Sequence, residues 1–281
     1  MELVRSAEEF LGSKGVTTAR LDAEWLLSHA LGKNRMELRL GRGIDISQLA
    51  LLNFWKAVKR RGNREPLQHI IGEVEFHGLV LTVNKNVLIP RHETEELVEK
   101  IIARIKNKAI GSILDLGTGS GAIGLALAKN FPHARVLAVD ISEIALGVAS
   151  GNAVENKISN IAFLQSNWFE KIHGQFDLIV SNPPYLSSEE LQMTDNEVKG
   201  FEPELALIAG DGGLASIFTI IESAGDFLRK DGLLAMETGY SQHERIASFA
   251  KKYFQNLETA RDLFGRDRFV FLRESPGQNF Q

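Results

Sequence analysis

The sequence predicts an α/β protein in which an N-terminal helical domain precedes a Rossmann-like domain. From residue 91 onward, short apolar strands alternate with amphipathic helices, a pattern typical of βαβ units around a mostly parallel sheet. Roughly the first 70 residues instead carry apolar side chains at helical spacing. We therefore expect a helical domain at 1–72, a β-hairpin linker at 73–90 and an α/β domain at 91–281.

Composition places the chain among ordinary folded proteins and excludes several chemistries. It has 281 residues, 44% hydrophobic and 24% charged, enough for two domains. The absence of Cys rules out disulfides, thiolate nucleophiles and Cys-ligated zinc, and the seven His are scattered without ligand spacing, so no metal site is expected. The N-terminus is acidic rather than signal-like, and no run approaches the roughly 20 apolar residues of a membrane helix. We expect a cytoplasmic protein without membrane contact.

The charge is unevenly distributed along the chain. Residues 1–90 hold 13 Lys or Arg and 10 Asp or Glu, net +3, whereas the remainder is net −7 within a total of −4. Because a dedicated duplex-DNA binder is usually more basic, no direct nucleic-acid partner is expected. The basic cluster "KAVKRRGNR", residues 56–64, either contacts an acidic partner or is a solvated helix end.

The expected elements of the first 108 residues follow from periodicity and from glycine stops. Three helices are expected at "SAEEFLGSKG" (6–15), "TTARLDAEWLLSHALGK" (17–33) and "DISQLALLNFWKAVKRRG" (45–62), each closed by a Gly. Next, "EVEFHGLVLTVNKNVLIPR" (73–91) reads as a β-hairpin. After Pro90, "HETEELVEKIIARIKNK" (92–108) begins a helix with an acidic first turn.

The α/β domain is expected to alternate strands and helices up to a closing antiparallel hairpin. Strands are expected at 112–117, 134–141, 161–166, 176–181 and 232–238. Helices are expected at 121–131, 142–156, 213–228 and 241–254, with a long connection before residue 213. The hairpin pairs "NLETARDL" (256–263) with "RFVFLRE" (268–274).

A glycine-rich loop predicts a cofactor site. "LDLGTGSGAIG" places Gly117, Gly119 and Gly121 directly after one expected strand and before a helix. Glycines let the backbone approach a ligand closely, and a helix N-terminus offers it free N–H groups. Asp140, 21 residues after Gly119, ends the next strand, where an acid can accept hydrogen bonds from both hydroxyls of an adenosine ribose.

This loop alone leaves the cofactor open. The stretch 117–122 also satisfies the dinucleotide fingerprint, so the anion at the helix is either the pyrophosphate of NAD or the carboxylate of S-adenosylmethionine. Asp115 favours S-adenosylmethionine, because a carboxylate there can meet the ammonium of that cofactor but would repel a pyrophosphate. We therefore expect S-adenosyl-L-methionine, with S-adenosyl-L-homocysteine as product.

The stretch "FDLIVSNPPY" predicts the reaction. Pro183 and Pro184 fix the backbone, so that the side-chain oxygen of Asn182 and a proline carbonyl can accept both hydrogens of one planar NH₂ group, on which Tyr185 can stack. The nitrogen of an amide or of an adenine amine is a poor nucleophile, and holding both hydrogens aims its lone pair at a sulfonium methyl group. A proline-rich strand cap is the alternative. Together with the glycine loop and Asp140, however, the four residues favour methyl transfer to a planar nitrogen.

The order "DLGTGSG", "VD" and "NPPY" resembles class I methyltransferases that act on planar nitrogens. The whole chain resembles the HemK/PrmC family, the glutamine N5-methyltransferases of peptide chain release factors, through "PLQHIIGEVEFHG", "LIPRHETEELVE" and "FEPELALIAGDGG" as well. The resemblance implies a helical substrate-binding domain, a hairpin linker and a seven-stranded mixed sheet with its last strand reversed. It also implies that the substrate is the glutamine of the Gly-Gly-Gln loop of release factors, and we expect a monomer.

Residue roles carried over by this resemblance define the expected site. The cofactor would be bound by Asp115, Gly117, Thr118, Gly119, Ser120, Gly121, Asp140, Ile141, Asn167, Trp168 and Asn182. The glutamine amide would be bound by the catalytic set Asn182, Pro183, Pro184 and Tyr185. Two departures from the family pattern stand out: His92 replaces a Pro in the linker, and Asn167 replaces an Asp beside the adenine.

Four other functions compete with this one. An adenine-N6 methyltransferase acting on DNA or RNA uses a similar planar amine, but such enzymes usually carry a basic groove or a recognition domain. A ribosomal-protein glutamine methyltransferase would need the same four residues. A non-catalytic cofactor-binding adaptor is disfavoured by the intact Asn-Pro-Pro-Tyr, and an NAD-dependent dehydrogenase by the lack of a catalytic His or Lys near a nicotinamide site.

Overall fold

The chain folds into two compact units in a computed structural model, which describes residues 2–40 and 45–273. The first unit holds the residues up to Glu73 together with Asp195–Phe201. The second holds Val74–Thr194 and the residues from Glu202 onward. Each unit has its own apolar core.

The first unit is a helical bundle. Its helices are α1 (Glu2–Ser13), α2 (Ala19–Leu31), α3 (Arg35–Leu40), α4 (Gln48–Gly62), α5 (Leu67–Ile71) and α10 (Asn196–Phe201). Leu11, Leu26 and Phe54 from three of these helices are fully buried in one cluster, as the helical spacing of apolar residues predicts. The short helices α3 and α5 are not among the expected elements.

One segment of the first unit comes from far along the chain. The sequence predicts residues 195–201 in the α/β domain, whereas the structure groups Asp195–Phe201 with the helical bundle. The reason is electrostatic: one carboxylate oxygen of Glu197 lies 2.9 Å from Nη1 of Arg61, and the other lies 2.7 Å from Nη2 of Arg64. Arg61 is itself buried and paired with Asp22 at 2.7 Å. Ion pairs therefore hold this segment against the helical bundle, and the spacing of residues in the sequence does not reveal them.

The expected linker hairpin is present as β1 (Glu73–Phe76) and β2 (Leu79–Thr82), which form a two-stranded sheet. Its turn uses the left-handed residues His77 and Gly78, with φ of 48° and 70°. The following helix α6 (His92–Ile105) begins at His92, the position where the family pattern has Pro. A helix start tolerates either residue, so this departure leaves the helix intact.

A seven-stranded mixed sheet forms the centre of the second unit, in the order β5-β4-β3-β6-β7-β9-β8. Its strands are β3 (Ser112–Leu116), β4 (Arg135–Asp140), β5 (Ile161–Gln165), β6 (Phe176–Ser181), β7 (Leu228–Glu237), β8 (Asn256–Arg261) and β9 (Asp267–Arg273). All pairings are parallel except those of β9, which is antiparallel to both of its neighbours. The predicted closing hairpin is therefore confirmed, with its last residue, Glu274, outside the described residues.

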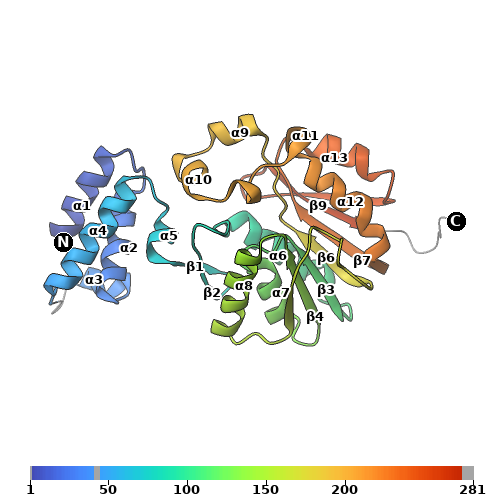
Figure 1. The fold of residues 1–281 in the computed structure, drawn as a ribbon, viewed down its shortest axis with the longest axis horizontal. Coiled ribbons are helices and arrows are strands. Elements are labelled where there is room, and N and C mark those ends of the chain that lie inside the picture. Colours follow the sequence, from blue (N-terminus) through green and yellow to red (C-terminus); the bar gives the residue numbers. More distant parts are fainter. Residues whose placement is uncertain (1, 41–44, 274–281) are drawn as a thin grey trace. The chain divides into compact units, whose positions relative to one another are not determined.

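Helices cover both faces of this sheet (Figure 1). One face carries α6, α7 (Ala122–Asn130) and α8 (Glu143–Glu155), and the other carries α12 (Ala215–Phe227) and α13 (His243–Ala250). Successive strand residues alternate between the two cores: Ile113 is buried on the α7 side and Leu114 on the α12 side. Because both faces are covered, the strands read as nearly continuous apolar runs.

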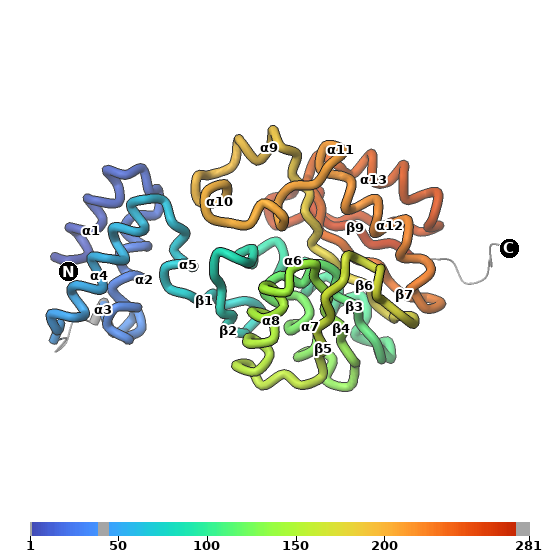
Figure 2. The backbone as a smooth tube through the Cα atoms, in the orientation of Figure 1, coloured from blue at the N-terminus to red at the C-terminus, as the bar shows by residue number. Residues whose placement is uncertain are grey.

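The long connection predicted between β6 and α12 contains short helices (Figure 2). They are α9 (Ser188–Met193), α10, the 3₁₀ turn η1 (Glu204–Ala206) and α11 (Gly210–Gly213). A capping box between Ser187 and Glu190 starts α9. No helix among the described residues is long and apolar enough to cross a membrane.

Candidate functional site

The glycine loop and the Asn-Pro-Pro-Tyr stretch lie at the same edge of the sheet. Strands β3 and β6 are parallel neighbours, and Leu116 pairs with Ser181 at their carboxyl ends. The hydroxyl of Ser181 donates a 2.7 Å hydrogen bond to the carbonyl of Leu116 and fastens the two strand ends together. In open α/β sheets, ligands bind at this edge. The two stretches are therefore adjacent in the structure.

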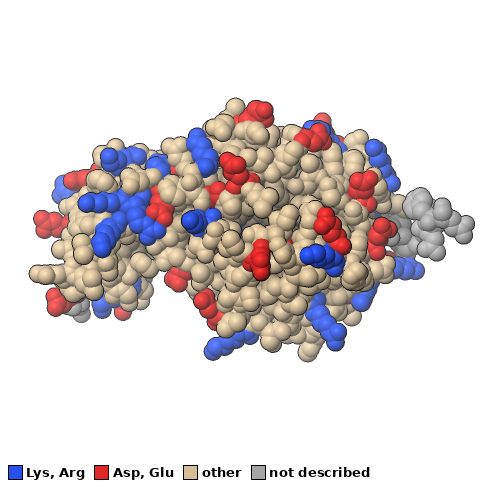
Figure 3. All heavy atoms as spheres, in the orientation of Figure 1, with Lys and Arg blue, Asp and Glu red and all other residues tan. Residues whose placement is uncertain are grey.

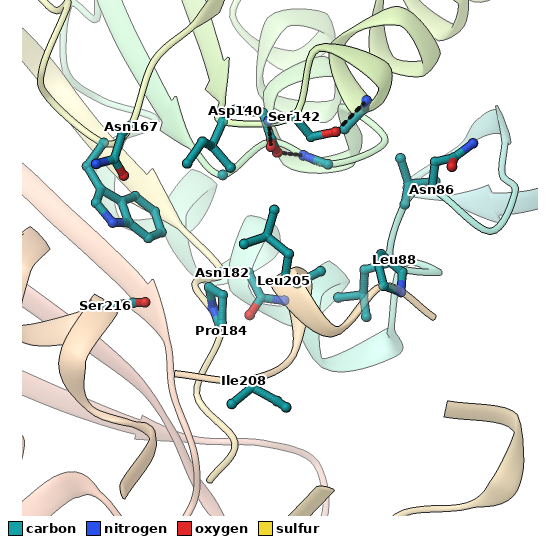
Figure 4. A pocket seen from close by; sticks show the side chains of 18 of the residues that line it. Asn86, Leu88, Asp140, Ser142, Asn167, Asn182, Pro184, Leu205, Ile208 and Ser216 are labelled. Carbon is teal, nitrogen blue, oxygen red and sulfur yellow. Dashed lines mark hydrogen bonds between the residues drawn. The ribbon is translucent and has the colours of Figure 1, made fainter. Parts of the chain in front are cut away.

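A pocket of about 250 Å³ opens at this edge (Figure 4). The predicted site residues that line it are Gly117, Gly119, Asp140, Ile141, Asn167, Trp168, Asn182 and Pro184. Asp140 lies on one wall, and Asn182 and Pro184 lie on the opposite one (Figure 4). The pocket thus joins the expected cofactor and acceptor residues in one hollow.

Six predicted site residues are not among the lining residues. They are Asp115, Thr118, Ser120, Gly121, Pro183 and Tyr185. All of them except Tyr185 are largely buried or packed directly behind the loop, and Tyr185 is half-buried. The structure gives them supporting contacts, and their direct contact with a ligand stays a prediction.

The backbone of the glycine loop takes left-handed conformations that its glycines permit. Gly117, Gly119 and Gly121 have φ of 70°, 57° and 85°. A Cβ at Gly121 would lie 3.0 Å from Leu125, so helix α7 packs closely there. A Cβ at Gly119 would meet nothing within 4 Å, so this position faces open space in the pocket. Gly119 therefore leaves room for a ligand beside the backbone.

Asp115 supports this loop from behind. Its Oδ2 accepts hydrogen bonds from the hydroxyl of Thr118 at 2.6 Å and from the N–H of Gly124 at 2.9 Å, and Oδ1 has no partner among the described residues. Asp115 is fully buried, and this burial raises its pKa to about 7. The bonds from Thr118 and Gly124, on the other hand, favour the ionised form. Asp115 thus ties β3 to the loop and to the first turn of α7, a role that its place in the sequence does not announce.

Asp140 is held by backbone N–H groups on both oxygens. Oδ2 accepts from Gly119 at 2.9 Å and Oδ1 accepts from Ser142 at 2.9 Å (Figure 4). Burial raises the pKa of Asp140, while the backbone bonds from Ser142, Gly119 and Ile141 oppose that effect. Each carboxylate oxygen keeps a lone pair for a further donor, as a ribose diol requires.

Asn167 and Trp168 form one side of the pocket. The side-chain amide of Asn167 donates a 2.7 Å hydrogen bond from Nδ2 to Glu170, which leaves Oδ1 as an acceptor. The replacement of Asp by Asn therefore preserves an acceptor at this wall. Trp168, at φ 46°, packs on the α12-side core, and its ring would lie 3.5 Å from a Cβ at Gly117. It is therefore both a core residue and a pocket residue.

Asn182 and Tyr185 point into a polar network behind the pocket. Nδ2 of Asn182 lies 3.1 Å from the hydroxyl oxygen of Thr94, and the hydroxyl of Tyr185 donates to Glu237 at 3.1 Å. The pKa of Tyr185 is raised by burial and by the nearby charge of Glu237. Among the described residues, none donates a hydrogen bond to the carbonyl of Pro183. Stacking of Tyr185 on a substrate stays a prediction, because its ring does not line the pocket.

Several supporting residues escape the reading of the sequence. The pocket is also lined by Asn86, Val87, Leu88, Ser142, Ala145, Ser166, Pro203, Leu205, Ala206, Ile208 and Ser216. The stretch "FEPELALIAGDGG" is the available signal for Pro203–Ile208, since it stands out as part of the family resemblance. The fully buried Asn152 on α8 accepts from the N–H of Thr82 at 2.7 Å and donates to the carbonyl of Ser120 at 2.9 Å. It thereby links the hairpin to the glycine loop.

The basic cluster at residues 56–64 is largely neutralised within its own unit. Lys and Arg side chains gather over the helical region of α1 and α4 on the face shown in Figure 3. Arg60 pairs with Glu65 at 2.5 Å, while Arg61 and Arg64 pair with acids at 2.7 Å. These contacts favour the structural interpretation of the cluster over an acidic partner.

The donor set fits S-adenosylmethionine better than a pyrophosphate cofactor. None of the described residues that line the pocket is Lys or Arg, so no cationic side chain would add to the helix N-terminus in binding a pyrophosphate. Among the described residues, no cluster of His, Asp and Glu is suited to a metal ion. Asp140 suits a ribose, and the open backbone at Gly119 suits the methionine moiety. Fold and site together define a class I S-adenosylmethionine-dependent methyltransferase.

Comparisons with known proteins agree with this class and narrow it. A methyltransferase small domain family model matches residues 94–199, and a PrmC N-terminal domain model matches residues 2–72. The fold is similar to that of the hMettl16 catalytic domain, at a TM-score of 0.58 with 13% identity over 85% of this chain and 86% of that one. Two relatives that are 41% and 39% identical to this chain over most of its length show that it belongs to the family of release factor glutamine methyltransferases.

Two relatives illustrate that membership. The release factor glutamine methyltransferase of Geobacter sulfurreducens is 41% identical over 93% of this chain and 92% of its own length. The protein of the same description from Haemophilus influenzae is 39% identical over 89% of this chain and 90% of its own length. The resemblance inferred from the sequence is therefore confirmed.

Proposed function

We propose that this enzyme methylates the side-chain amide nitrogen, N5, of the glutamine in the Gly-Gly-Gln motif of peptide chain release factors. The observation that carries the proposal is the position of Asn182 and Pro184 across one pocket from Asp140, whose Oδ2 accepts from the N–H of Gly119. The printed names of relatives of similar length support the choice of substrate.

S-adenosylmethionine, when bound, supplies a methyl group on a positively charged sulfur that a correctly oriented nitrogen can attack. The residues that would hold it are Asp140 at the ribose, Gly117 and Gly119 at the methionine moiety, and Asn167 with Trp168 at the adenine. Asp140 is fixed in place by two backbone N–H groups, so it offers its acceptors without reorganisation.

The chain's contribution to catalysis is the orientation of the acceptor amide. Oδ1 of Asn182 and the carbonyl of Pro183 are acceptors in the same stretch, and both can bind hydrogens of one NH₂ group. An amide nitrogen whose hydrogens are held in this way directs its lone pair away from them. Such positioning can supply up to roughly 7–11 kcal/mol of barrier reduction. A strong base is unnecessary, since the nitrogen loses a proton only after it has become cationic.

We further propose that the enzyme acts as a monomer in the cytoplasm and on protein rather than nucleic acid. The residues that line the pocket include no Lys or Arg among those described, and residues 91–281 carry a net charge of −7, so neither feature favours a nucleic-acid substrate. Gln-specific recognition would then come from the Asn-Pro-Pro-Tyr stretch.

Radiolabelled methyl transfer to purified release factor, ribosomal proteins and DNA in parallel tests the substrate. We expect label on the release factor alone, and no label on a release factor whose Gly-Gly-Gln glutamine is replaced by Ala. Label on DNA alone or on ribosomal protein alone would overturn the proposal that release factors are the substrate.

Asn182→Ala tests the role of the acceptor-binding amide. We expect it to abolish transfer while the Kd for S-adenosylmethionine, measured by calorimetry, stays within about tenfold, because Asn182 chiefly orients the acceptor. Equal losses in cofactor affinity and transfer would show that Asn182 serves the cofactor instead.

A further inference from the structure

A buried polar chain connects Asn182 to a carboxylate on another strand. Thr94, in the first turn of α6, donates its hydroxyl to Oε2 of Glu237 at 2.7 Å. The same hydroxyl oxygen accepts from Nδ2 of Asn182 at 3.1 Å. Glu237 ends β7 and is 1% exposed, and Thr94 is 4% exposed. The other carboxylate oxygen of Glu237, Oε1, accepts from the hydroxyl of Tyr185 at 3.1 Å.

The direction of each hydrogen bond in this chain follows from donor and acceptor chemistry. Thr94 has a single hydroxyl proton, and it is donated to Oε2 of Glu237. The oxygen of Thr94 then has only lone pairs left, and the group of Asn182 that faces it must be the NH₂. Oδ1 of Asn182 is consequently free to accept from another molecule. Reversal of the amide would place a carbonyl against a lone pair.

Both carboxylate oxygens of Glu237 accept from hydroxyl groups, although the net effect of the surroundings is to raise its pKa. Burial raises its pKa, and the nearby Glu93 acts in the same direction. The hydroxyl of Thr94, the charge of Arg268 and the hydroxyl of Tyr185 act against that rise. Arg268, on β9, is buried and donates to the carbonyl of Thr238 at 3.2 Å, which places its charge at the same strand end.

We propose that Thr94 and Glu237 are positioning residues that determine which atom of the Asn182 amide faces the substrate. The inference rests on the proposed function in one respect, namely that the acceptor is an NH₂ group. Such an acceptor needs an oxygen from Asn182, and a reversed amide would present a second donor to it. The chain from Glu237 through Thr94 prevents that reversal before substrate arrives, and Tyr185 is anchored by the same carboxylate.

Substitutions at Thr94 separate the hydroxyl from its packing. Thr94→Val keeps the shape and removes the hydroxyl, whereas Thr94→Ser keeps the hydroxyl. We expect Thr94→Val to lower kcat by about 10- to 100-fold, since a misplaced catalytic group commonly costs that much, with little change in cofactor Kd. Thr94→Ser should restore kcat to within about threefold of the wild type. Thr219→Val, at an exposed position of α12, is the matched control and should leave kcat unchanged.

A second pair of variants tests the carboxylate. Glu237→Gln has one acceptor for two hydroxyl donors, so it should lower kcat by about 10- to 100-fold. Adding Tyr185→Phe removes one donor and lets the new amide oxygen face Thr94. The double variant should therefore be no slower than Glu237→Gln alone, whereas independent effects would multiply. The proposal would be overturned if the losses of kcat in the double variant multiplied. It would also be overturned if kcat of Thr94→Val stayed within about twofold of wild type, or if Thr94→Ser were as slow as Thr94→Val.

A measurement on the free enzyme makes the test independent of the substrate. In ¹⁵N-labelled protein, the side-chain NH₂ signals of Asn182, assigned by their loss in Asn182→Ala, should exchange slowly with solvent. Thr94→Val should speed that exchange at least about tenfold, and Thr94→Ser should not. Unchanged exchange in Thr94→Val would overturn the relay. If the wild type labels no release factor, only the proposed substrate fails, because the exchange measurement still decides the orientation.

Discussion

The buried Asp115 predicts a specific pH dependence of stability. Because burial raises its pKa from 3.8 to about 7, the folded protein binds a proton here more readily than the unfolded chain does. The contribution of Asp115 to the free energy of unfolding is fully present below its ordinary pKa and is lost as pH rises through about 7. The whole difference corresponds to roughly 4 kcal/mol, at about 1.36 kcal/mol per pKa unit.

Asp115→Asn removes this dependence while keeping a carbonyl acceptor for Thr118 and Gly124. The free energy of unfolding of the variant, minus that of the wild type, should therefore rise by roughly 3 kcal/mol between about pH 5 and about pH 8, as urea denaturation followed by circular dichroism would show. Both proteins are measured without cofactor.

Asp177→Asn serves as the control. Burial would raise the pKa of Asp177, but hydrogen bonds from Gly111 and Ser112 together with the charge of Arg229 lower it overall. Asp177 is therefore ionised in both folded and unfolded chains over this range, and its variant should differ from wild type by a constant amount. A difference for Asp115→Asn that varies by less than about 1 kcal/mol over the range would refute the reasoning.

Two further changes test local geometry. Gly213→Ala would place a Cβ 2.2 Å from the carbonyl of Tyr185 at a φ of 85°, so we expect a loss of more than about 2 kcal/mol of unfolding free energy and reduced kcat. Gly147→Ala, in α8 with no atom within 4 Å of a new Cβ, should instead gain about 0.5–1 kcal/mol; similar losses in both would contradict this. His92→Pro should gain about 0.4–1 kcal/mol in thermal unfolding, because Arg91 already has the extended φ and ψ of −101° and 157° that precede proline; a loss would show that His92 matters to the start of α6.

The order of elements in the second unit could be predicted because each depends on nearby residues. The apolar run at 112–116 is a strand whichever neighbour it finds, and the glycines after it require the left-handed conformations that the structure shows. The position of Asp140 also follows from spacing, since it ends the next strand of a βαβ unit. Local chemistry therefore fixed the fold class and half of the pocket.

Charge pairs between distant residues could not be predicted in the same way. Segment 195–201 reads as part of a loop in the α/β domain, whereas in the structure it belongs to the helical unit, where Glu197 pairs with Arg61 and Arg64. The partners are more than 130 residues apart in the chain. The composition of segment 195–201 and of the stretch around Arg61 and Arg64 does not indicate that the two are in contact.

Contacts between distant residues also explain why the orientation of the Asn182 amide could not be predicted from the sequence. Prolines do fix the backbone at Asn182, but the backbone alone does not decide which end of a side-chain amide faces the pocket. That choice depends on Thr94, which lies 88 residues before Asn182 in the chain, and on Glu237, which lies 143 residues after Thr94. Both are ordinary polar residues within their own elements, one in an acidic first helical turn and one at a strand end. The buried carboxylate of Glu237 thus determines, through Thr94, how the Asn182 side-chain amide is oriented, whereas the sequence Asn-Pro-Pro-Tyr specifies only a rigid backbone.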